Sequence, residues 1–367
     1  MNDKKVAALY TVDPRIPDRN TIQIAAECLI RGGLVAFPTE TVYGLGANAF
    51  DPEAVKRIFQ AKGRPFHDPL IVHLASIDDI PDVAAEVPEA VGLLGKRFWP
   101  GPLTLLLPRR PAVPPEVSAG LQTVAVRVPS HPVSQALLRA AGVPVAAPSA
   151  NRFGHISATL ARHVMEDLGR RIDLILDAGP ADWGVESTIL DPLRSPPVLL
   201  RPGAVSKEDI EAVIGPVQVA RPDERISSAP GRQPRHYAPY VRLILCEGGE
   251  PERIADCLSA AALRMGAEHH RIGLLAASEI CRRIDPMEPP LILRDLGPLD
   301  DMRQISRRLF AGLRELETEG VEVILAHRLP SEGLGAAIND RLTRAAAEAG
   351  EAGPRGDEYQ PPMDTSS

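Results

Sequence analysis

The chain has 367 residues, of which 44% are hydrophobic and 24% are charged, and this composition is typical of globular proteins. Its length predicts two domains, because a single hydrophobic core rarely grows beyond about 250–300 residues. The net charge of −7 argues against a general nucleic-acid-binding protein, which needs a basic surface to displace counterions. A local basic pocket for a small polyanion remains compatible with that charge.

The cysteines and the N-terminal segment indicate where the protein works. Four cysteines stand at positions 28, 246, 257 and 281 without a C-x-x-C pair, and this spacing predicts neither a zinc site nor a disulfide framework. The first residues lack the apolar core of a signal peptide, and no apolar stretch approaches the roughly 18 residues of a membrane helix. We therefore expect a cytoplasmic protein with reduced thiols and no membrane segment.

The first block of the chain, from about Asp13 to Gly215, alternates helical patterns with short apolar strands. Asn20 is the expected N-cap of a helix that stops at Gly32-Gly33. Asp51-Pro52 opens another helix, which ends near Gly63. Further helices are expected at 131–141, 158–168 and 206–214, and strands at 34–37, 70–74, 103–107, 123–128, 143–147, 173–176, 187–190 and 198–200. Strands interleaved with helices predict an α/β domain with a twisted, largely buried sheet.

The remainder divides into a linker, a second block and a tail. Residues 216–240 contain many turn formers and no sustained period, which is typical of a linker. In the block at 241–349, strands are expected at 241–246, 271–276, 291–295 and 321–326, with helices at 251–265, 299–319 and 335–348. That order predicts a smaller Rossmann-like βαβα domain. Residues 350–367 are polar and rich in proline, and we expect them to be disordered.

The run FPTETVYGLG at 37–46 is the first that suggests a ligand site. We interpret it as the end of a strand, followed by hydroxyl residues and a glycine-rich turn. Thr39, Thr41 and Tyr43 are candidates to line a cleft at the carboxyl end of that strand, where open α/β sheets bind ligands. The alternative is a capped turn whose hydroxyls bond local backbone. Neither a conventional phosphate loop nor a complete dinucleotide fingerprint is present in the sequence.

Basic side chains follow at the ends of other elements. Lys62 and Arg64 stand where a helix passes into a proline-stiffened loop, so Arg64 is a candidate for bidentate phosphate binding. The alternative is that both cations only stabilise the helix C-terminus. His73 lies in the next strand, where a histidine is more often structural than a ligand. Arg201 precedes a Pro-Gly turn and is a further candidate for a phosphate contact.

The run TVAVRVP at 123–129 places an arginine in an apolar strand. Alternation puts Thr123, Ala125 and Arg127 on one face of this strand. Because an unpaired buried charge costs several kcal/mol, Arg127 needs an anionic partner. That partner is either a core acid or the carboxylate or phosphate of a substrate.

These strand-end candidates are rich in cations and hydroxyls and poor in acids. The sequence contains no Ser-His-Asp arrangement, no H-E-x-x-H and no carboxylate pair suited to glycoside chemistry. A site of this kind suits transfer at phosphorus, where positioning and charge neutralisation supply most of the catalysis.

Taken together, these runs resemble the long form of the YrdC family of threonylcarbamoyl-AMP synthases. The matching motifs are PTETVYGLG, K-x-R-P-x-x-x-P-L at 62–70, GPLT at 101–104, AVRVP at 125–129, PSAN at 148–151, GVESTI at 184–189 and LRPG at 200–203. They occur in the family's order over nearly all of residues 20–215. The second block resembles that form's extra C-terminal domain, particularly in GLGAAINDRLTRAA at 333–346, and the linker matches its S-x-P-G…H-Y-A-P stretch at 228–239. Ala158 departs from the proline common in relatives.

The resemblance implies a nucleotidyltransferase, an L-threonylcarbamoyladenylate synthase that uses L-threonine, bicarbonate or CO2, and ATP with Mg²⁺. It releases pyrophosphate and passes its product to a tRNA threonylcarbamoyltransferase, which modifies the adenosine beside the anticodon. No protein-held metal site and no stable nucleic-acid binding are implied. The implied threonine pocket is Thr41, His73, Arg127, Ala147 and Ser187. The implied ATP pocket is Arg64, Asp68, Thr123, Ser149, Ser157, Arg201 and Tyr237, with Lys62 and Arg64 as catalytic residues.

Two other interpretations stay open at this point. A non-catalytic RNA-binding module would use the same basic cleft, although the net charge and the lack of interleaved basic and aromatic residues weigh against it. A carbamoyltransferase module acting on other carbamoyl-adenylates is disfavoured by the few, scattered cysteines. The linker, which carries His236 and Tyr237, is expected to cover bound ATP; the alternative is a solvated connector.

Overall fold

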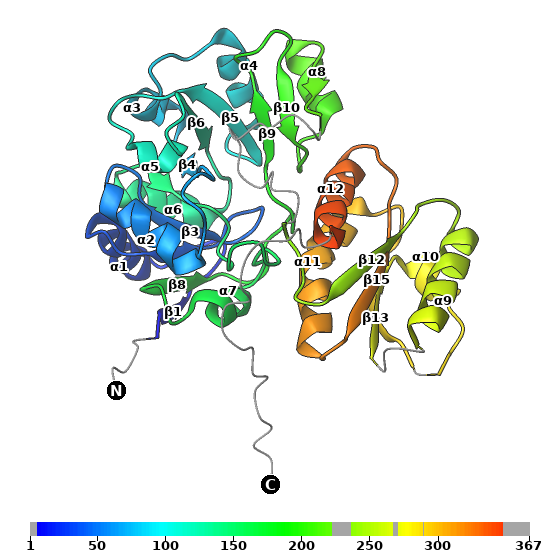
Figure 1. The fold of residues 1–367 in the computed structure, drawn as a ribbon. Helices are drawn as coiled ribbons and strands as arrows, with labels where there is room; N and C mark the ends of the chain where they lie inside the picture. The colour runs from blue at the N-terminus through cyan, green and yellow to red at the C-terminus, as the bar shows by residue number, and fades with distance from the viewer. Residues whose placement is uncertain (1–5, 222–235, 267–270, 289, 348–367) are drawn as a thin grey trace.

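The computed structural model describes residues 6–221, 236–266, 271–288 and 290–347, in which the chain forms two sheets with their helices, lying side by side (Figure 1). The predictions for 222–235 in the linker and for the tail at 350–367 lie outside the described residues. None of the helices in the described ranges is long and apolar enough to cross a membrane.

The larger sheet has eleven strands in the described residues, in the order β1-β8-β2-β3-β7-β4-β6-β5-β9-β10-β11. It is mixed, with β4 parallel to β6 and β5 antiparallel to β6. The near-continuous apolar sequence of β5 is buried from Leu103 to Leu107, as expected of a strand covered on both faces. The strands are β1 (Ala8–Thr11), β2 (Val35–Phe37), β3 (Gly44–Asn48), β4 (Ile71–His73), β5 (Leu103–Pro108), β6 (Thr123–Arg127), β7 (Val145–Ala146), β8 (Leu174–Asp177), β9 (Thr188–Asp191), β10 (Val198–Arg201) and β11 (Gln218–Val219).

Helices cover both faces of this sheet. Along β2, Val35 and Phe37 belong to a buried cluster with residues of α1 and α6, whereas Ala36 belongs to the buried cluster that includes residues of α2, α4 and α7. The predicted start and end of α2 are confirmed, because the side chain of Asp51 caps its first turn and Gly63 ends it with a φ of 68°. The helices are α1 (Arg19–Ile30), α2 (Pro52–Lys62), α3 (Ile80–Val83), α4 (Glu89–Phe98), α5 (Pro115–Ser118), α6 (Pro132–Ala141), α7 (Ala161–Leu168) and α8 (Lys207–Ile214), with a short 3-10 helix at Ile77–Asp79.

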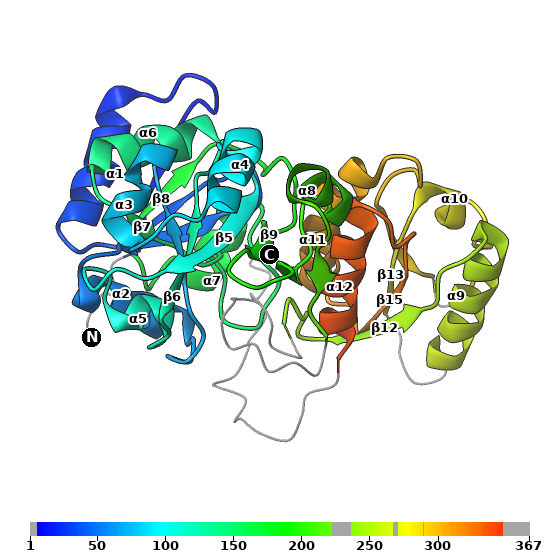
Figure 2. The ribbon, with the colours of Figure 1, turned by 90° about the horizontal axis from the view of Figure 1, so that it is seen from above.

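The second sheet is parallel and confirms the predicted Rossmann-like unit. Its order is β12-β15-β13-β14, so the chain crosses over between strands through helices. Helices α11 and α12 lie between this sheet and the larger domain, whereas α9 and α10 cover its far face (Figures 1 and 2). The elements are β12 (Arg242–Cys246), α9 (Pro251–Gly266), β13 (Ile272–Ala276), α10 (Ser278–Cys281), β14 (Ile292–Asp295), α11 (Met302–Thr318), β15 (Val323–His327) and α12 (Leu334–Ala346).

The two domains share buried apolar surface. Val42, Ile156 and Val185 of the first domain belong to the same buried cluster as Phe310 on α11. The linker residue Tyr237 joins this cluster, with its ring stacked on that of Phe310 at a centroid distance of 5.7 Å. The interface is therefore continuous with the core of the second domain.

A group of buried charges, which we call the interdomain clasp, also joins the domains. Its members are His155 and Asp167 of the first domain and Arg314 and Glu317 of α11. The two ring nitrogens of His155 lie 3.2 Å from Asp167 and 3.0 Å from Glu317. The guanidinium of Arg314 donates to Asp167 at 2.7 Å and to the carbonyl of Ile156 at 2.5 Å. Each buried charge thus meets an opposite charge across the interface.

Several predicted boundaries are wrong. The N-cap of α1 is Asp18, whose carboxylate accepts from the amide of Thr21, and not Asn20. The first block does not stop at 13 and 215, because β1 pairs with β8 before that range and β11 pairs with β10 after it. The helix expected at 158–168 begins only at Ala161.

The predicted glycine-rich turn at 44–46 is a strand, β3, that pairs with β2. Neither glycine has a positive φ, so no turn geometry requires them. A Cβ at Gly46 would meet Phe37 and Val145 at 2.8 Å, which is closer than side chains can pack. Gly46 therefore serves the close approach of neighbouring strands rather than a turn.

Candidate active site

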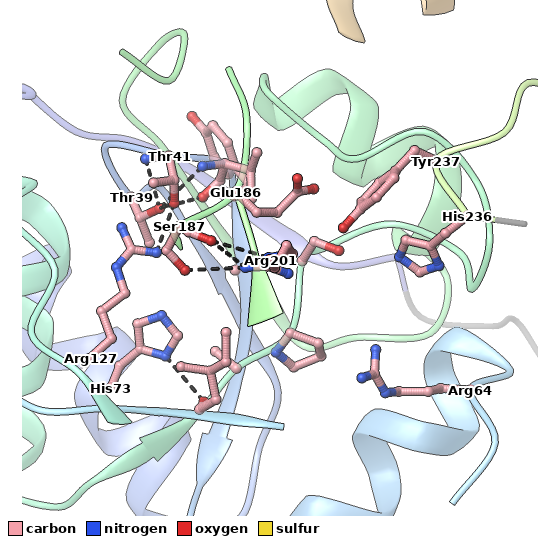
Figure 3. Close-up of a pocket in the computed structure, with 17 residues that line it drawn as sticks. Thr39, Thr41, Arg64, His73, Arg127, Glu186, Ser187, Arg201, His236 and Tyr237 are labelled. Carbon is pink, nitrogen blue, oxygen red and sulfur yellow. Dashed lines mark hydrogen bonds between the residues drawn. The ribbon is translucent and has the colours of Figure 1, made fainter. Parts of the chain in front are cut away.

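A pocket lies where strand ends and loops of the larger sheet meet the linker. Figure 3 shows Arg127 and His73 on the opposite side of the pocket from Arg64 and His236, with Arg201 between them. The lining residues are Thr39, Thr41, Val42, Tyr43, Gly44, Arg64, Ile71, His73, Arg127, Ala147, Pro148, Ser149, Glu186, Ser187, Arg201, His236 and Tyr237.

One side of the pocket, which we call the strand side, consists of Thr41, His73, Arg127 and Ala147. Arg127 ends β6, and its Nη1 donates to the hydroxyl of Thr41 at 2.8 Å. Its Nη2 lies 2.7 Å from Oε1 of Glu40, in an ion pair whose geometry is not that of a hydrogen bond. Both of these charged side chains are 4% exposed. A core acid is thus present as a partner of Arg127, one of the partners that the sequence left open.

His73 lies beside Arg127 because β4 and β6 are parallel neighbours with these two residues in register. Burial and the nearby Arg127 charge lower the pKa of His73 to about 3. The imidazole is therefore neutral at physiological pH. It can offer a hydrogen bond to a ligand without adding a charge.

Ser187 and Arg201 form the floor between the two sides. Arg201 ends β10 and donates to the carbonyl of Ser187 at 2.9 Å and to its hydroxyl at 3.2 Å. The same hydroxyl lies 2.8 Å from that of Thr104. Burial lowers the pKa of Arg201, but an arginine stays charged at physiological pH. A fixed cation is thus presented at the centre of the pocket.

The other side, which we call the linker side, consists of Arg64, Glu186, His236 and Tyr237. Arg64 follows the C-cap of α2, and its side chain donates to the carbonyls of Asp68 at 3.0 Å and Pro69 at 2.7 Å. These bonds and a 3.0 Å ion pair with Asp68 fix the guanidinium at the pocket wall. Its Nη1 donates no hydrogen bond within the described residues, so that group is available to a ligand.

The linker contributes an aromatic pair to this side. Tyr237 has a φ of 60°, an unusual value outside glycine, and its ring stacks on that of Phe310. Its hydroxyl is buried and bonds to nothing in the described part of the chain. Burial and the cations Arg64 and Lys62 hold the pKa of His236 well below its usual value, so this ring is neutral. The linker therefore presents polar atoms without adding charge.

Glu186 supplies the carboxylate of the linker side and is almost completely buried. Its Oε1 accepts from the hydroxyl of Ser157 at 2.5 Å. Its Oε2 accepts from Nε of Arg341, on α12 of the second domain, at 2.8 Å. The second domain thus reaches a residue that lines the pocket.

Of the thirteen residues that the resemblance assigns to the site, nine line this pocket and four do not; Thr39 and Tyr43, expected from the first run, line it as well. Lys62 donates to the carbonyls of Ser149 and Asn151 at 2.6 and 2.5 Å and thereby holds the loop after β7. Asp68 pairs with Arg64, and Ser157 bonds to Glu186. Thr123 starts β6, at the opposite end of this strand from Arg127. The nine are Thr41, Arg64, His73, Arg127, Ala147, Ser149, Ser187, Arg201 and Tyr237.

Sequence reasoning assigned no role to Glu40, Glu186 or Arg341. The first two stand inside quoted motifs, PTETVYGLG and GVESTI, beside residues that were selected. The acid within each motif was therefore an available signal. Arg341 stands in the motif of the second domain, 155 residues from its partner, and nothing local links the two.

The described residues contain no group of three or more histidine, cysteine or acidic side chains that could hold a metal ion. The carboxylate that lines the pocket, Glu186, already accepts from Ser157 and Arg341.

Comparisons with known proteins agree over both domains. A family model described as "Telomere recombination" matches residues 27–203, and a model described as "Threonylcarbamoyl-AMP synthase, C-terminal domain" matches residues 205–347. The threonylcarbamoyl-AMP synthase of Pyrococcus abyssi is 44% identical over 328 residues, covering 88% of this chain and 93% of that protein. The enzyme of the same name from Bacillus subtilis is 44% identical over 345 residues, covering 92% and 94% of the two chains.

A solved structure also matches across the whole fold. It is the crystal structure of P. abyssi Sua5 complexed with L-threonine, which is 42% identical to this chain. The match covers 93% of this chain and 98% of that one, with a TM-score of 0.84. The similarity therefore includes both domains and their arrangement.

Proposed function

This chain belongs to the threonylcarbamoyl-AMP synthase family of enzymes, and from that premise we propose that its pocket makes threonylcarbamoyl-AMP and pyrophosphate from L-threonine, bicarbonate or CO2, and ATP. The reaction makes it a nucleotidyltransferase. The threonine complex of P. abyssi Sua5 supports threonine as the amino acid substrate here as well. We expect the reaction to take place in the cytoplasm, where its product passes to a tRNA threonylcarbamoyltransferase.

One observation carries this proposal. Three arginines, Arg64, Arg127 and Arg201, converge on one pocket whose lining carboxylate, Glu186, is already bonded to Arg341. Both reactants, a carbamate of threonine and ATP, are anions that repel each other. Cations fixed in a buried pocket reduce that repulsion and need no reorganisation during the reaction.

The strand side suits threonine. Arg127 provides a cation for the carboxylate of the amino acid, and the hydroxyl of Thr41, 2.8 Å from Nη1, is fixed beside it. The neutral ring of His73 adds no charge that would repel an amine. The amine must be unprotonated to capture CO2, and the resulting carbamate then carries the nucleophilic oxygen.

The linker side suits ATP. Arg64 and Arg201 would hold the phosphates, and Lys62 keeps the loop with Ser149 in place. A carbamate oxygen forms a bond to the α-phosphorus while the bond from that phosphorus to the bridging oxygen breaks, and pyrophosphate leaves. Mg²⁺ bound to the triphosphate would neutralise part of the charge of the leaving group. The buried walls limit the access of water to the labile carbamate and adenylate.

The full-length chain should release pyrophosphate only when ATP, threonine and bicarbonate are all present. The measurement is pyrophosphate release together with detection of the adenylate by mass spectrometry. Equal release with serine, or without any amino acid, contradicts the proposal. A protein that shows no turnover but binds RNA with a steep dependence on salt would instead support the RNA-binding interpretation.

A further inference from the structure

Arg341 connects the second domain to the pocket. It lies on α12, but its side chain is 1% exposed and contacts the first domain. Nε donates to Glu186 at 2.8 Å, and Nη1 donates to the carbonyl of Pro202 at 3.0 Å. The guanidinium also lies over the ring of Tyr237, at 5.1 Å from its centroid. Arg341 thus contacts two lining residues of the linker side without lining the pocket itself.

Several charged groups surround Arg341. Asp340 pairs with Arg341 at 2.8 Å and with Arg344 at 3.0 Å, while Glu186 pairs with Arg341. Arg201 interacts electrostatically with Arg341, Glu186 and Asp340. Without Arg341, Glu186 would lose the guanidinium that donates to its Oε2.

The loss of this partner would act at Glu186. Among the described residues that line the pocket it is the one carboxylate, and it belongs to the side that we assign to ATP. Its Oε1 also holds the hydroxyl of Ser157 at 2.5 Å. An unpaired Glu186 would repel the phosphates, and it would also be able to move and release Ser157.

We propose that Arg341 is a positioning residue of the active site, which neutralises Glu186 and fixes Ser157 and Tyr237 so that the linker side accepts ATP. The second domain thereby completes the pocket of the first. This inference rests on the proposed function, because it assigns the linker side to the nucleotide.

The test compares Arg341→Met with the full-length wild type in pyrophosphate release, with ATP and threonine varied separately. Methionine keeps most of the apolar volume but loses the charge and the donors. The KM for ATP should rise by about tenfold to a hundredfold, as expected when a buried carboxylate loses a charged partner. The KM for threonine should stay within about threefold, because the strand side contains no contact to Arg341. Arg328→Met is the matched control, since the side-chain partners of Arg328, Glu247 and Thr343, both belong to the second domain.

The conservative variant Arg341→Lys separates neutralisation from simple domain docking. It keeps a cation beside Glu186 and Tyr237, so it should fold even if Arg341→Met does not, and its KM for ATP should lie within about threefold of the wild type. A KM for ATP about tenfold or more above wild type in Arg341→Lys overturns the inference, as does an unchanged KM in Arg341→Met. If the wild type itself releases no pyrophosphate with threonine, the proposed function fails, whatever the variants do.

Discussion

The two sides of the pocket are held in place by different parts of the molecule. On the strand side, Arg127 contacts Thr41 and Glu40, and all three belong to the first domain. On the linker side, Glu186 is bonded to Arg341, and Tyr237 stacks on Phe310, so both depend on the second domain. On the strand side, His73 and Arg127 lie on neighbouring strands, whereas the linker side is completed by an interface.

This difference predicts different behaviour for the two substrates. Groups on neighbouring strands are fixed by backbone hydrogen bonds, so the threonine side should be formed before any ligand binds. Groups at an interface between domains depend on docking, which is usually weaker than the core of a domain. ATP binding should therefore respond to changes in the second domain, and threonine binding should not.

The largest effect is expected from Arg127→Ala. The change removes the cation of the strand side and leaves Glu40 as a buried, unpaired carboxylate, which typically costs about 3–5 kcal/mol. Threonine affinity should fall by far more than ATP affinity in isothermal titration calorimetry. Arg139→Ala is the matched control, because this arginine is exposed on α6. Equal losses for the two ligands would contradict the division of the pocket into two sides.

Arg201→Ala should have a smaller effect on ligand binding than Arg127→Ala, and it should weaken the binding of ATP more than that of threonine. This arginine donates to the carbonyl and hydroxyl of Ser187, and its charge faces the centre of the pocket. Hydrogen bonds to charged groups contribute about 1.5–3 kcal/mol, so ATP should bind about tenfold to a hundredfold more weakly, with less change for threonine. Arg194→Ala, on the neighbouring β9–β10 connection, serves as the control. A greater loss for threonine than for ATP would show that Arg201 belongs to the strand side.

The smallest effect is a pH dependence of stability that comes from the interdomain clasp. Burial alone would lower the pKa of His155, but its hydrogen bonds to Asp167 and Glu317 outweigh burial and raise this pKa. The stabilisation is complete below the ordinary histidine value of about 6.5 and is lost as the pH rises through the raised pKa. The free energy of unfolding should fall by at most about 1.4 kcal/mol per pH unit in that window.

The other groups around His155 do not change this sign. Burial alone would raise the pKa of Asp167, but the hydrogen bond from His155 and the charge of Arg314 outweigh burial and lower this pKa. Asp167 therefore stays ionised. The pKa of His163 is lowered to about 3 by burial and by Arg314, so this ring affects stability only below about pH 6.5. When His155→Gln is unfolded with denaturant, its free energy of unfolding should not decrease above about pH 6.5. A decrease equal to that of the wild type would assign the effect to another group.

Most of the strand side could be predicted from the sequence, because apolar residues alternate regularly along the strands that carry it. Arg127 in an apolar strand required a partner, and β4 and β6 brought His73 into register with it. The outline of both sheets followed from the same alternation of apolar strands and helices. The sequence did not predict the strand β3, because Gly44 and Gly46 are typical of a turn, whereas Gly46 allows neighbouring strands to approach closely.

The linker side was harder to predict because its contacts join distant parts of the chain. Glu186 and Arg341 are 155 residues apart, and His155 and Glu317 are 162 residues apart. No local pattern links such pairs, since each forms only when two finished domains meet. The motifs singled out the right segments, but they did not show which side chains within them face one another.

The buried cluster that Val42, Ile156 and Val185 share with Phe310 has a consequence for how the protein unfolds. Unfolding of either domain would expose the apolar surface of the other to water. Heat or denaturant should therefore unfold the two domains in a single cooperative transition. A chain cut after Arg221, which keeps β11 with the larger sheet, would expose these apolar side chains to water, and exposed apolar patches promote self-association. We therefore expect the first domain to self-associate more readily when it is separated from the second.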